Sequence, residues 1–386
     1  MSGNMYDVIV VGAGSMGMSA GFHLAKRGMS TLLIDSFDPP HTHGSHHDEP
    51  RLIRHAYSGG PSYVALALKA DRLWQELEAA IGCRLLVRSG VLNMSEGDAA
   101  FRSRMDDAAS LGVRVEMLDS VEIRKRWPGL RLPETYVGMY EPDAGYLHSE
   151  RSVSAYRQLA LNEGAMLLPY TPVQHIWTEG GVVHVQTRAG VFQAEQAIVS
   201  VGAWFESLQS YVTLPIRAVR KTVGWFRSEP GLFDAGAFPG FTLGTDNGGY
   251  YGFPSIDGAG VKIGRHDGGV PWHPGEPMEP FGGYKEDEGD LRRTLETFMP
   301  LAAGALLRGT VCKYELTPDE HFIIDRHPAH SNVLLAGGFS GHGFKFSSAV
   351  GAILADLIER RKPDVDIDMF ALSRFESPKA GIQQTY

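Results

Sequence analysis

Cysteine is scarce in this chain of 386 residues, which contains only Cys83 and Cys312. Two cysteines cannot form the disulfide framework of a small secreted protein, so a reducing compartment, the cytoplasm, is expected. The first residues, MSGNMYD, have neither a basic region nor an apolar core. No signal peptide is therefore predicted.

Basic clusters and long apolar runs are also missing. The net charge is −9 and no basic run occurs, which argues against nucleic acid or an acidic membrane surface as a partner. No stretch approaches the roughly 18 uninterrupted apolar residues of a membrane span. Glycine is abundant, with 46 residues, and a hydrophobic content of 43% is that of an ordinary globular protein. A chain of this length forms two domains or one large domain.

The first forty residues carry a dinucleotide-binding pattern. An apolar run at residues 8–11 has the length and β-branched character of a buried strand. It leads into G-x-G-x-x-G, formed by Gly12, Gly14 and Gly17. The first glycine permits a tight turn, the second lets backbone approach a pyrophosphate, and the third lets the next helix pack closely on the strand. A second strand ends in Asp35, an acid placed to accept a hydrogen bond from a ribose hydroxyl. The acid argues against a 2′-phosphate, so the segment predicts FAD or NAD without choosing between them.

A loop rich in proline and histidine follows at residues 38–57, DPPHTHGSHHDEPRLIRHAY, and no regular structure is expected before about Arg51. Four of its histidines are close in sequence: His41, His43, His46 and His47. A metal site is one interpretation, but neither a cysteine nor a well-spaced carboxylate completes it, and no metal is predicted. The alternatives are a solvated polar loop, or a loop beside the cofactor that brings the positive charge of Arg51 and Arg54 to it.

Further along, the pattern of apolar residues changes twice. Helices are predicted at residues 63–80, 98–110, 149–164, 203–208, 291–299 and 347–361, and strands at 88–94, 182–187, 191–193, 197–202, 219–226, 249–253, 260–264 and 332–338. The short strands between residues 215 and 265 are separated by glycine and proline turns, which is typical of antiparallel sheet. The buried style of the first strand returns at residues 332–338, so the dinucleotide domain is expected to consist of separated segments.

The predicted fold is therefore α/β, an α+β two-domain protein. Residues 1–87, 145–217 and 319–386 are expected to form a Rossmann-type domain in discontinuous segments. Residues 88–144 and 218–318 are expected to form a mainly antiparallel β substrate domain that roofs a cavity.

Seven motifs occur in this order: GAGSMG, DPPHTHGSHH, RLIRHAY, YYGFPS, VKIGRH, VCKYELTPDEHFIID and GFSGHGFKFSS. Together they resemble the family of monomeric sarcosine oxidase and N-methyltryptophan oxidase, from Tyr6 to about Phe375. The resemblance implies a flavoprotein with FAD bound covalently to a cysteine sulfur at the flavin 8α position, and the matching residue is Cys312. Without the resemblance, a buried apolar cysteine would be the commoner role. Cys83 has no such context and is expected to be structural.

The resemblance also implies roles for individual residues. Those expected to bind the cofactor, besides the glycines, Asp35 and Cys312, are Ser45, His46 and Lys345. Those expected to bind the substrate are Arg54 and Lys345 at its carboxylate, Gly341 through its carbonyl at the amine, and Thr242. The expected catalytic residues are Lys262, His47, Arg51, Tyr251 and His266. His47 and Arg51 are expected beside the flavin ring, and Tyr251 and His266 along the substrate cavity.

Two of these implied roles make direct chemical sense. Arginine, as at Arg54, offers two parallel hydrogen bonds to a carboxylate and keeps its charge. Lys262 matches a lysine that activates oxygen beside flavin N5 through a bridging water, because a fixed positive charge stabilises the anion that develops on O₂. Without the resemblance, the alternating pattern VKIG would predict a solvated strand lysine.

The implied reaction is oxidation of a secondary, sarcosine-like amino acid at a C–N bond. Imine hydrolysis and reduction of O₂ to H₂O₂ follow. The expected partners are therefore the small amino acid and O₂, and the expected state is a monomer. Other readings remain open. The substrate could be N-methyltryptophan, a cyclic imino acid or a glycated amino acid. The protein could be a dehydrogenase with another acceptor, an NAD-binding protein without flavin, or an inactive binding protein.

Departures from the family pattern leave the substrate open. The family usually reads SHHGDTR where this chain has SHHDEPR. Pro50 thus replaces a threonine and loses a hydroxyl and a backbone N–H, while Asp48 and Glu49 add negative charge close to the expected flavin. Thr242 stands where sarcosine oxidases carry methionine and where N-methyltryptophan oxidase also has threonine.

Overall fold

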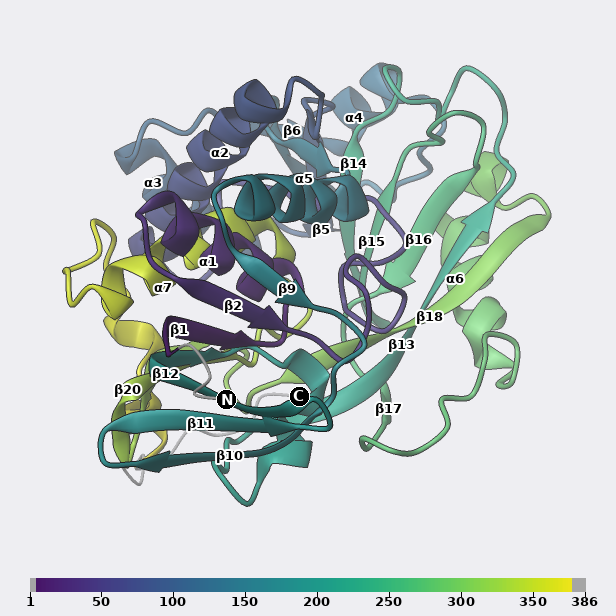
Figure 1. The fold of residues 1–386 in the computed structure, drawn as a ribbon. Helices are drawn as coiled ribbons and strands as arrows, with labels where there is room; N and C mark the ends of the chain where they lie inside the picture. Colours follow the sequence, from purple (N-terminus) through teal and green to yellow (C-terminus); the bar gives the residue numbers. More distant parts are fainter. Residues whose placement is uncertain (1–4, 377–386) are drawn as a thin grey trace.

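The structure of the protein is a computed structural model that describes residues 5–376. Residues 1–4, which belong to the stretch used above to predict the absence of a signal peptide, lie outside the described residues. So does the end of the third expected segment of the dinucleotide domain. Two large sheets lie side by side, one framed by helices and the other extending away from them (Figure 1).

The first sheet contains the predicted dinucleotide strands. Its members are β1 (Tyr6–Val11), β2 (Thr31–Ile34), β9 (Met166–Leu168), β10 (Val173–Glu179), β11 (Val182–Thr187), β12 (Gly190–Val199), β19 (Ile323–His327) and β20 (His330–Gly337). Its centre is parallel: β12 pairs with β1 and β20, and β2 pairs with β1 and β9. Side chains of β1 alternate between two cores. Val8 and Val10 pack in the helix-side core, whereas Ile9 and Val11 pack on the opposite face.

Helices cover the face of this sheet to which Val8 and Val10 point. They are α1 (Ser15–Lys26), α2 (Pro61–Ile81), α5 (Ser149–Asn162) and α7 (Ser347–Ile358). Helix α1 lies between α5 and α7 and contacts both (Figure 1). Gly21 on α1 faces Leu33 of β2, where a Cβ would lie 2.7 Å from the leucine side chain, so helix and sheet approach closely.

The second sheet is mainly antiparallel, as predicted. Its members are β5 (Val91–Glu96), β6 (Glu116–Asp119), β7 (Tyr136–Glu141), β13 (Arg217–Phe226), β14 (Gly240–Thr245), β15 (Gly248–Phe253), β16 (Val261–Arg265), β17 (Val270–Pro271) and β18 (Leu306–Leu316). Only the β14–β5 pair is parallel among the pairs described. Helices α3 (Ala99–Ser110), α4 (Ser120–Arg126) and α6 (Glu286–Phe298) accompany it.

A small third sheet and short 3₁₀ helices complete the described chain. The sheet comprises β3 (Arg51–Ile53), β4 (Leu86–Val87) and β8 (Gly145–Leu147), and the 3₁₀ helices are η1 (Gly202–Leu208), η2 (Pro300–Ala302), η3 (Phe344–Phe346), η4 (Asp368–Phe370) and η5 (Leu372–Phe375). None of the helices within residues 5–376 combines the length and the apolar character that a bilayer crossing requires.

Several elements differ from the sequence expectation. The strand expected at residues 88–94 begins only at Val91, as β5. The expected strands at residues 191–193 and 197–202 are one continuous strand, β12, because β11, β1 and β20 pair along its length. The segment at 203–208 forms a 3₁₀ helix rather than an α-helix. The strands of the two large sheets follow the expected segment boundaries, apart from Arg217 at the start of β13. This distribution supports the two-domain division, which stays a prediction.

Candidate active site

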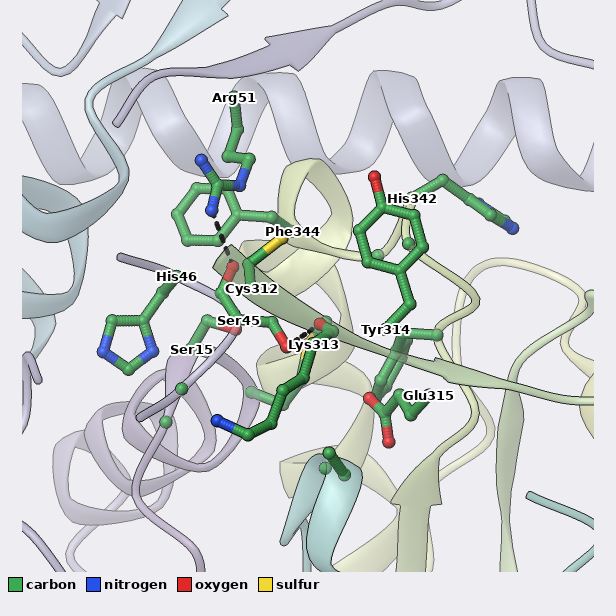
Figure 2. A pocket seen from close by; sticks show the side chains of 18 of the residues that line it. Ser15, Ser45, His46, Arg51, Cys312, Lys313, Tyr314, Glu315, His342 and Phe344 are labelled. Carbon is green, nitrogen blue, oxygen red and sulfur yellow. Dashed lines mark hydrogen bonds between the residues drawn. The ribbon is translucent and has the colours of Figure 1, made fainter. Parts of the chain in front are cut away.

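A cavity of about 660 Å³ lies between the two sheets. The β1–α1 turn, the loop before β3 and residues 200–204 after β12 line one part of it, and β15, β16, β18 and residues 341–345 line another. Figure 2 shows Cys312 and Tyr314 on β18 beside the glycine-turn residue Ser15 and the histidine-rich loop. Segments far apart in sequence therefore meet at one site.

The three glycines of the β1–α1 turn do different things. Gly12 has φ of +89°, and a Cβ there would lie 2.6 Å from the carbonyl oxygen of Ser200. Gly14 lines the cavity, and its nearest neighbour to a Cβ would be His46 Nδ1, 3.9 Å away. A Cβ on Gly17 would lie 2.0 Å from the carbonyl oxygen of Gly12. Gly17 therefore packs the helix against the strand, while Gly14 leaves room for a ligand.

Asp35 lies at the end of β2 and lines the same part of the cavity. Its Oδ2 accepts a hydrogen bond of 2.8 Å from the backbone N–H of Ala13, which fixes the acid beside the glycine turn. Its Oδ1 accepts from the backbone N–H of Phe37 at 2.9 Å and lies 3.2 Å from His41 Nε2. The acid is thus held in the place that the sequence pattern predicts for a ribose contact.

Arg51 holds the histidine-rich loop against the cavity. Its guanidinium donates to four backbone carbonyls, those of Ser45 (2.9 Å), His47 (2.6 Å), Asp48 (2.8 Å) and Pro50 (2.9 Å). The loop that sequence reasoning placed beside a cofactor therefore lines the cavity with an arginine whose donors are engaged by backbone.

The histidines of this loop bond within it. His46 Nε2 accepts from the backbone N–H of His41 at 3.1 Å, and His41 Nδ1 accepts from that of Gly44 at 3.0 Å. Burial lowers the pKa of His46 well below its usual value, so the ring is neutral. Ser45 Oγ donates to the carbonyl oxygen of Lys313 at 2.9 Å and ties the loop to β18. Residues 5–376 contain no group of three or more His, Cys, Asp or Glu arranged to hold a metal.

The two acids that depart from the family pattern are both neutralised by neighbours. Asp48 lines the cavity, lies 2.6 Å from His47 Nδ1 and forms an ion pair with Arg308. Glu49 pairs with His148 at 3.3 Å and with Arg151. Burial and the charge of Arg51 lower the pKa of His47 to about 4, so its neutral ring donates to Asp48.

Cys312 is buried on β18 and lines the cavity, whereas Cys83 is exposed after the end of α2. Burial raises the pKa of the Cys312 thiol, and the positive charges of Arg51 and Lys262 oppose that shift. In Figure 2 the sulfur lies close to the guanidinium of Arg51. The two cations reduce the cost of forming a thiolate here, although burial outweighs them and the pKa of the thiol stays raised.

Cations gather at the end of the cavity near β5. Arg54 Nη1 donates to Asn93 Oδ1 at 2.9 Å, and the hydroxyl of Thr242 donates to the same oxygen at 2.9 Å. Arg54 Nε is buried without a hydrogen-bond partner among the residues described. Lys345 Nζ donates to the carbonyl oxygen of His342 at 2.7 Å. Burial, followed by the charge of Arg54, lowers the pKa of Lys345 well below its usual value. An anion bound here would offset the desolvation cost of Arg54 and would favour the protonated form of Lys345.

The walls of this end come from β15, β18 and the turn after β20. Gly341 has φ of +75°, and a Cβ there would lie 2.1 Å from the Tyr314 ring. The hydroxyl of Tyr314 donates to that of Tyr251 at 3.4 Å. Burial, then the charge of Arg54, lowers the pKa of His266 to about 4, so its ring is neutral. No sequence motif singled out Tyr314, although its position two residues after Cys312 on a strand places both on one face.

Lys262 lies inside the protein, with an exposed fraction of 2%. Its Nζ donates to the carbonyl oxygens of Asp48 at 2.5 Å and Pro50 at 3.4 Å. The rings of Trp225 and Phe253 lie 4.9 and 5.2 Å from the ammonium. Burial and the charge of Arg51 lower the pKa of Lys262 well below its usual value. The solvated strand lysine that alternation alone would predict is therefore wrong.

Sequence reasoning also missed two charged residues near Cys312. Glu315 is buried, and its Oε2 accepts from the backbone N–H of Gly338 at 3.2 Å; burial raises its pKa to about 7. Lys313 Nζ lies 5.0 Å from the Trp204 ring and 4.9 Å from the Trp272 ring. Both line the cavity. Their proximity to Cys312 in sequence was the available signal.

Residues 7–357 match the DAO family, described as FAD dependent oxidoreductase. The chain is 47% identical to monomeric sarcosine oxidase of Bacillus sp. (strain B-0618), over 98% of each chain. The chain belongs to the FAD-dependent oxidoreductases. Within that family it groups with the flavin-dependent amine oxidases. It is also 41% identical to N-methyl-L-tryptophan oxidase of Escherichia coli (strain SMS-3-5 / SECEC), over 96% of this chain and 100% of that protein.

Solved structures agree on the fold of this FAD-dependent oxidoreductase. L-proline dehydrogenase from P. horikoshii aligns with a TM-score of 0.84 at 21% identity, over 97% of this chain and 98% of the other. Glycine oxidase from Geobacillus kaustophilus aligns with a TM-score of 0.79 at 23% identity, over 96% and 99%. At these identities the similarity establishes the fold alone.

The cavity fits the FAD of this family. The missing side chain of Gly14 leaves space beside the N-terminus of α1, where backbone amides favour a phosphate. Asp35 supplies an acceptor next to that space, and the same cavity continues to Cys312. The glycine pattern alone was compatible with FAD or NAD, and the family match decides in favour of FAD.

Proposed function

We propose that this FAD-dependent oxidoreductase oxidises a secondary, sarcosine-like N-methyl amino acid and passes the electrons to O₂. The single observation that carries the proposal is the pair of basic side chains, half-buried Arg54 and buried Lys345, that line the end of the cavity near β5. The sarcosine and N-methyl-L-tryptophan oxidases named above are the relatives that support the substrate class.

Bound FAD would accept a hydride equivalent from the carbon next to the substrate nitrogen. Water would hydrolyse the resulting imine, and O₂ would be reduced to H₂O₂. In the proposal, Arg54 and Lys345 bind the substrate carboxylate and Gly341 offers its carbonyl to the amine. The hydroxyl of Thr242 fixes Asn93 beside Arg54. Tyr251 and neutral His266 form the wall of the amine pocket.

The remaining roles concern the cofactor and oxygen. Cys312 is proposed as the covalent attachment point, with Ser45, His46 and the backbone beside Lys345 among the cofactor contacts. His47 and Arg51 fix the loop at the flavin. Lys262 is proposed to stabilise negative charge that develops on O₂. Its ammonium donates hydrogen bonds directly to the carbonyls of Asp48 and Pro50. A water that bridges Lys262 to the flavin would therefore bind an ammonium that already has these two acceptors.

We also propose that the protein works as a monomer in the reducing cytoplasm. The relatives named monomeric sarcosine oxidase support the first point, and the two free cysteines support the second.

A purified sample tests the proposal. The protein should be yellow and should form H₂O₂ from sarcosine or another N-methyl amino acid in air, without an added electron acceptor. A panel of N-methyl, cyclic and glycated amino acids ranks the substrates. Reduction of a dye or quinone without peroxide would favour a dehydrogenase and reject the oxidase.

A further inference from the structure

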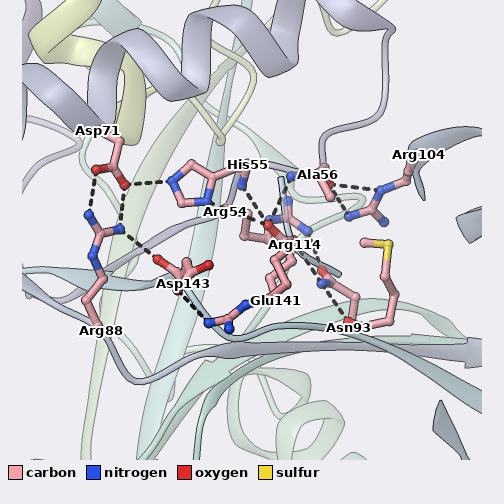
Figure 3. A network of polar contacts seen from close by, with 11 residues as sticks. Arg54, His55, Ala56, Asp71, Arg88, Asn93, Arg104, Arg114, Glu141 and Asp143 are labelled. Carbon is pink, nitrogen blue, oxygen red and sulfur yellow. Dashed lines mark hydrogen bonds and ion pairs between the residues drawn. The ribbon is translucent and has the colours of Figure 1, made fainter. Parts of the chain in front are cut away.

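Arginines that are buried or half-buried in this protein differ in whether they pair with a carboxylate. Arg220 donates to both oxygens of Asp287, at 2.8 and 2.7 Å. Within the described residues, neither Arg54 nor Arg104 has a carboxylate at ion-pair distance. Figure 3 shows their contacts instead, from Arg54 to Asn93 and from Arg104 to the backbone of Ala56. Both unpaired arginines line the cavity, whereas Arg220 does not.

Only some of the hydrogen-bond donors of Arg104 bond to other residues of the protein. Its Nε and Nη2 donate to one oxygen, the carbonyl of Ala56, at 3.2 and 2.8 Å. A guanidinium carries five N–H donors, so three donors of this cavity-lining residue remain for another partner. Burial, with the charge of Arg54 nearby, lowers the pKa of Arg104 to about 10, and the group stays charged at neutral pH.

Residues of β5 and the start of α3 line part of the same cavity as Arg54. We call this part the α3 compartment; its lining residues are Met94, Ser95, Ala100, Phe101 and Arg104. Residues 100, 101 and 104 share one face at the start of α3. Its walls are mostly apolar, and the guanidinium carbon of Arg104 lies 5.6 Å from the Phe101 ring. Apolar walls beside one cation suit a short carbon chain that ends in an anion.

Glu141, whose charge acts on Arg104, already accepts hydrogen bonds from other groups. Glu141 Oε2 accepts from the backbone N–H groups of His55 at 2.7 Å and Ala56 at 3.0 Å, and its Oε1 accepts from Asn93 Nδ2 at 3.3 Å. It lowers the local positive potential without contacting Arg104. An anion from outside the protein is therefore the natural partner of that guanidinium.

We propose that the α3 compartment binds an acidic side chain of the substrate, so that N-methyl amino acids with a second carboxylate are the preferred class. The proposal rests on the proposed function, in which Arg54 and Lys345 bind the carboxylate next to the amine. Arg104 then binds the second carboxylate at the far end of the side chain. N-Methyl-L-glutamate and N-methyl-L-aspartate have this chemistry.

Two measurements on the holoenzyme test the assignment. The first is the kcat/KM ratio of N-methyl-L-glutamate to N-methyl-L-glutamine, with sarcosine as reference. The second is calorimetric binding of unreactive thioethers, comparing methylthioacetate, 2-(methylthio)glutarate and the 5-amide of the latter. The variants are Arg104→Met, Arg104→Lys and the control Arg102→Met. Arg102 lies on the same helix with 74% of its side chain exposed, and pairs with Asp98.

In the unmodified protein, the acid should exceed its amide by about 10- to 100-fold in both measurements. Arg104→Met should abolish that preference with sarcosine and methylthioacetate unchanged, Arg104→Lys should restore part of it, and Arg102→Met should keep it whole. The absence of a preference, or an equal loss for every ligand in Arg104→Met, would overturn the proposal. If no N-methyl amino acid is oxidised, the proposed function fails while the thioether comparison still decides the role of Arg104.

Discussion

The two ends of the cavity are built by different means. At the dinucleotide end, the backbone forms the binding surface. Gly12 permits a tight turn, and Gly14 leaves a space that a side chain would narrow. At the amine end, the chemistry lies in charged side chains such as Arg54 and Lys345, which come from elements far apart in sequence. Damage to the first end should therefore remove cofactor or stability, and damage to the second should change ligand affinity in an intact flavoprotein.

The largest expected effect is the loss of covalently bound flavin when the buried thiol of Cys312 is removed. In the unmodified protein, acid precipitation should leave the yellow colour in the pellet. Cys312→Ser should release all flavin to the supernatant, because no sulfur remains to bind it. Cys83→Ser is the matched control and should retain the colour, since Cys83 is exposed and does not line the cavity. Free flavin from the unmodified protein would reject covalent attachment.

Next in size is the effect of Lys262→Met on oxygen. Anaerobic reduction of the flavin by substrate should keep a similar rate, whereas reoxidation in air should slow by about 10²–10³, because one preorganised charge is lost. Stopped-flow absorbance measures both halves. Only the protonated amine carries charge, so reoxidation of the unmodified enzyme should slow as pH rises through the lowered pKa of Lys262. The variant should lack that dependence, and normal reoxidation with collapsed reduction would assign the lysine to the amine.

Arg54→Met should weaken binding of methylthioacetate by about 10- to 150-fold, since a charge-assisted hydrogen bond is worth about 1.5–3 kcal/mol. Reoxidation by O₂ should stay at its normal rate in this variant, which separates it from Lys262→Met. Titration of the flavin absorbance gives the affinity. Lys345→Met should behave similarly, and unchanged affinity in both variants would remove the carboxylate site from this end.

The smallest expected effect is a difference in stability between alanine variants of two glycines in the same motif, Gly17 and Gly14. Gly17→Ala places a Cβ against the Gly12 carbonyl and should destabilise the fold by about 1–3 kcal/mol. Gly14→Ala meets no atom closer than 3.9 Å and should leave the unfolding midpoint of the flavin-free protein nearly unchanged. Its cost should appear as weaker FAD binding, measured in the Cys312→Ser background by fluorescence. Equal unfolding midpoints for the two variants would contradict this division.

The sequence predicts the β1–α1–β2 unit well because its determinants are contiguous: an apolar strand, three glycines and Asp35. Long-range pairing escaped it. The merging of two expected strands into β12 depends on β11, β1 and β20 lying along its edges. Arg104 gave no local signal either, since its place in the cavity depends on α3 lying against the backbone of Ala56. Positions such as Lys262 and Lys345 could be named only through the family resemblance.

The position of β20 in the parallel sheet has a consequence for how the protein is made. Val333 pairs with Ala197 on β12, and β11 pairs only with residues 190–194 of that strand, so residues 197–199 have no partner on this side until residues 330–337 leave the ribosome. An unpaired edge strand is prone to associate with other chains. Slow translation between β12 and β20 should therefore favour aggregation, and FAD should be captured only after synthesis has passed Gly337.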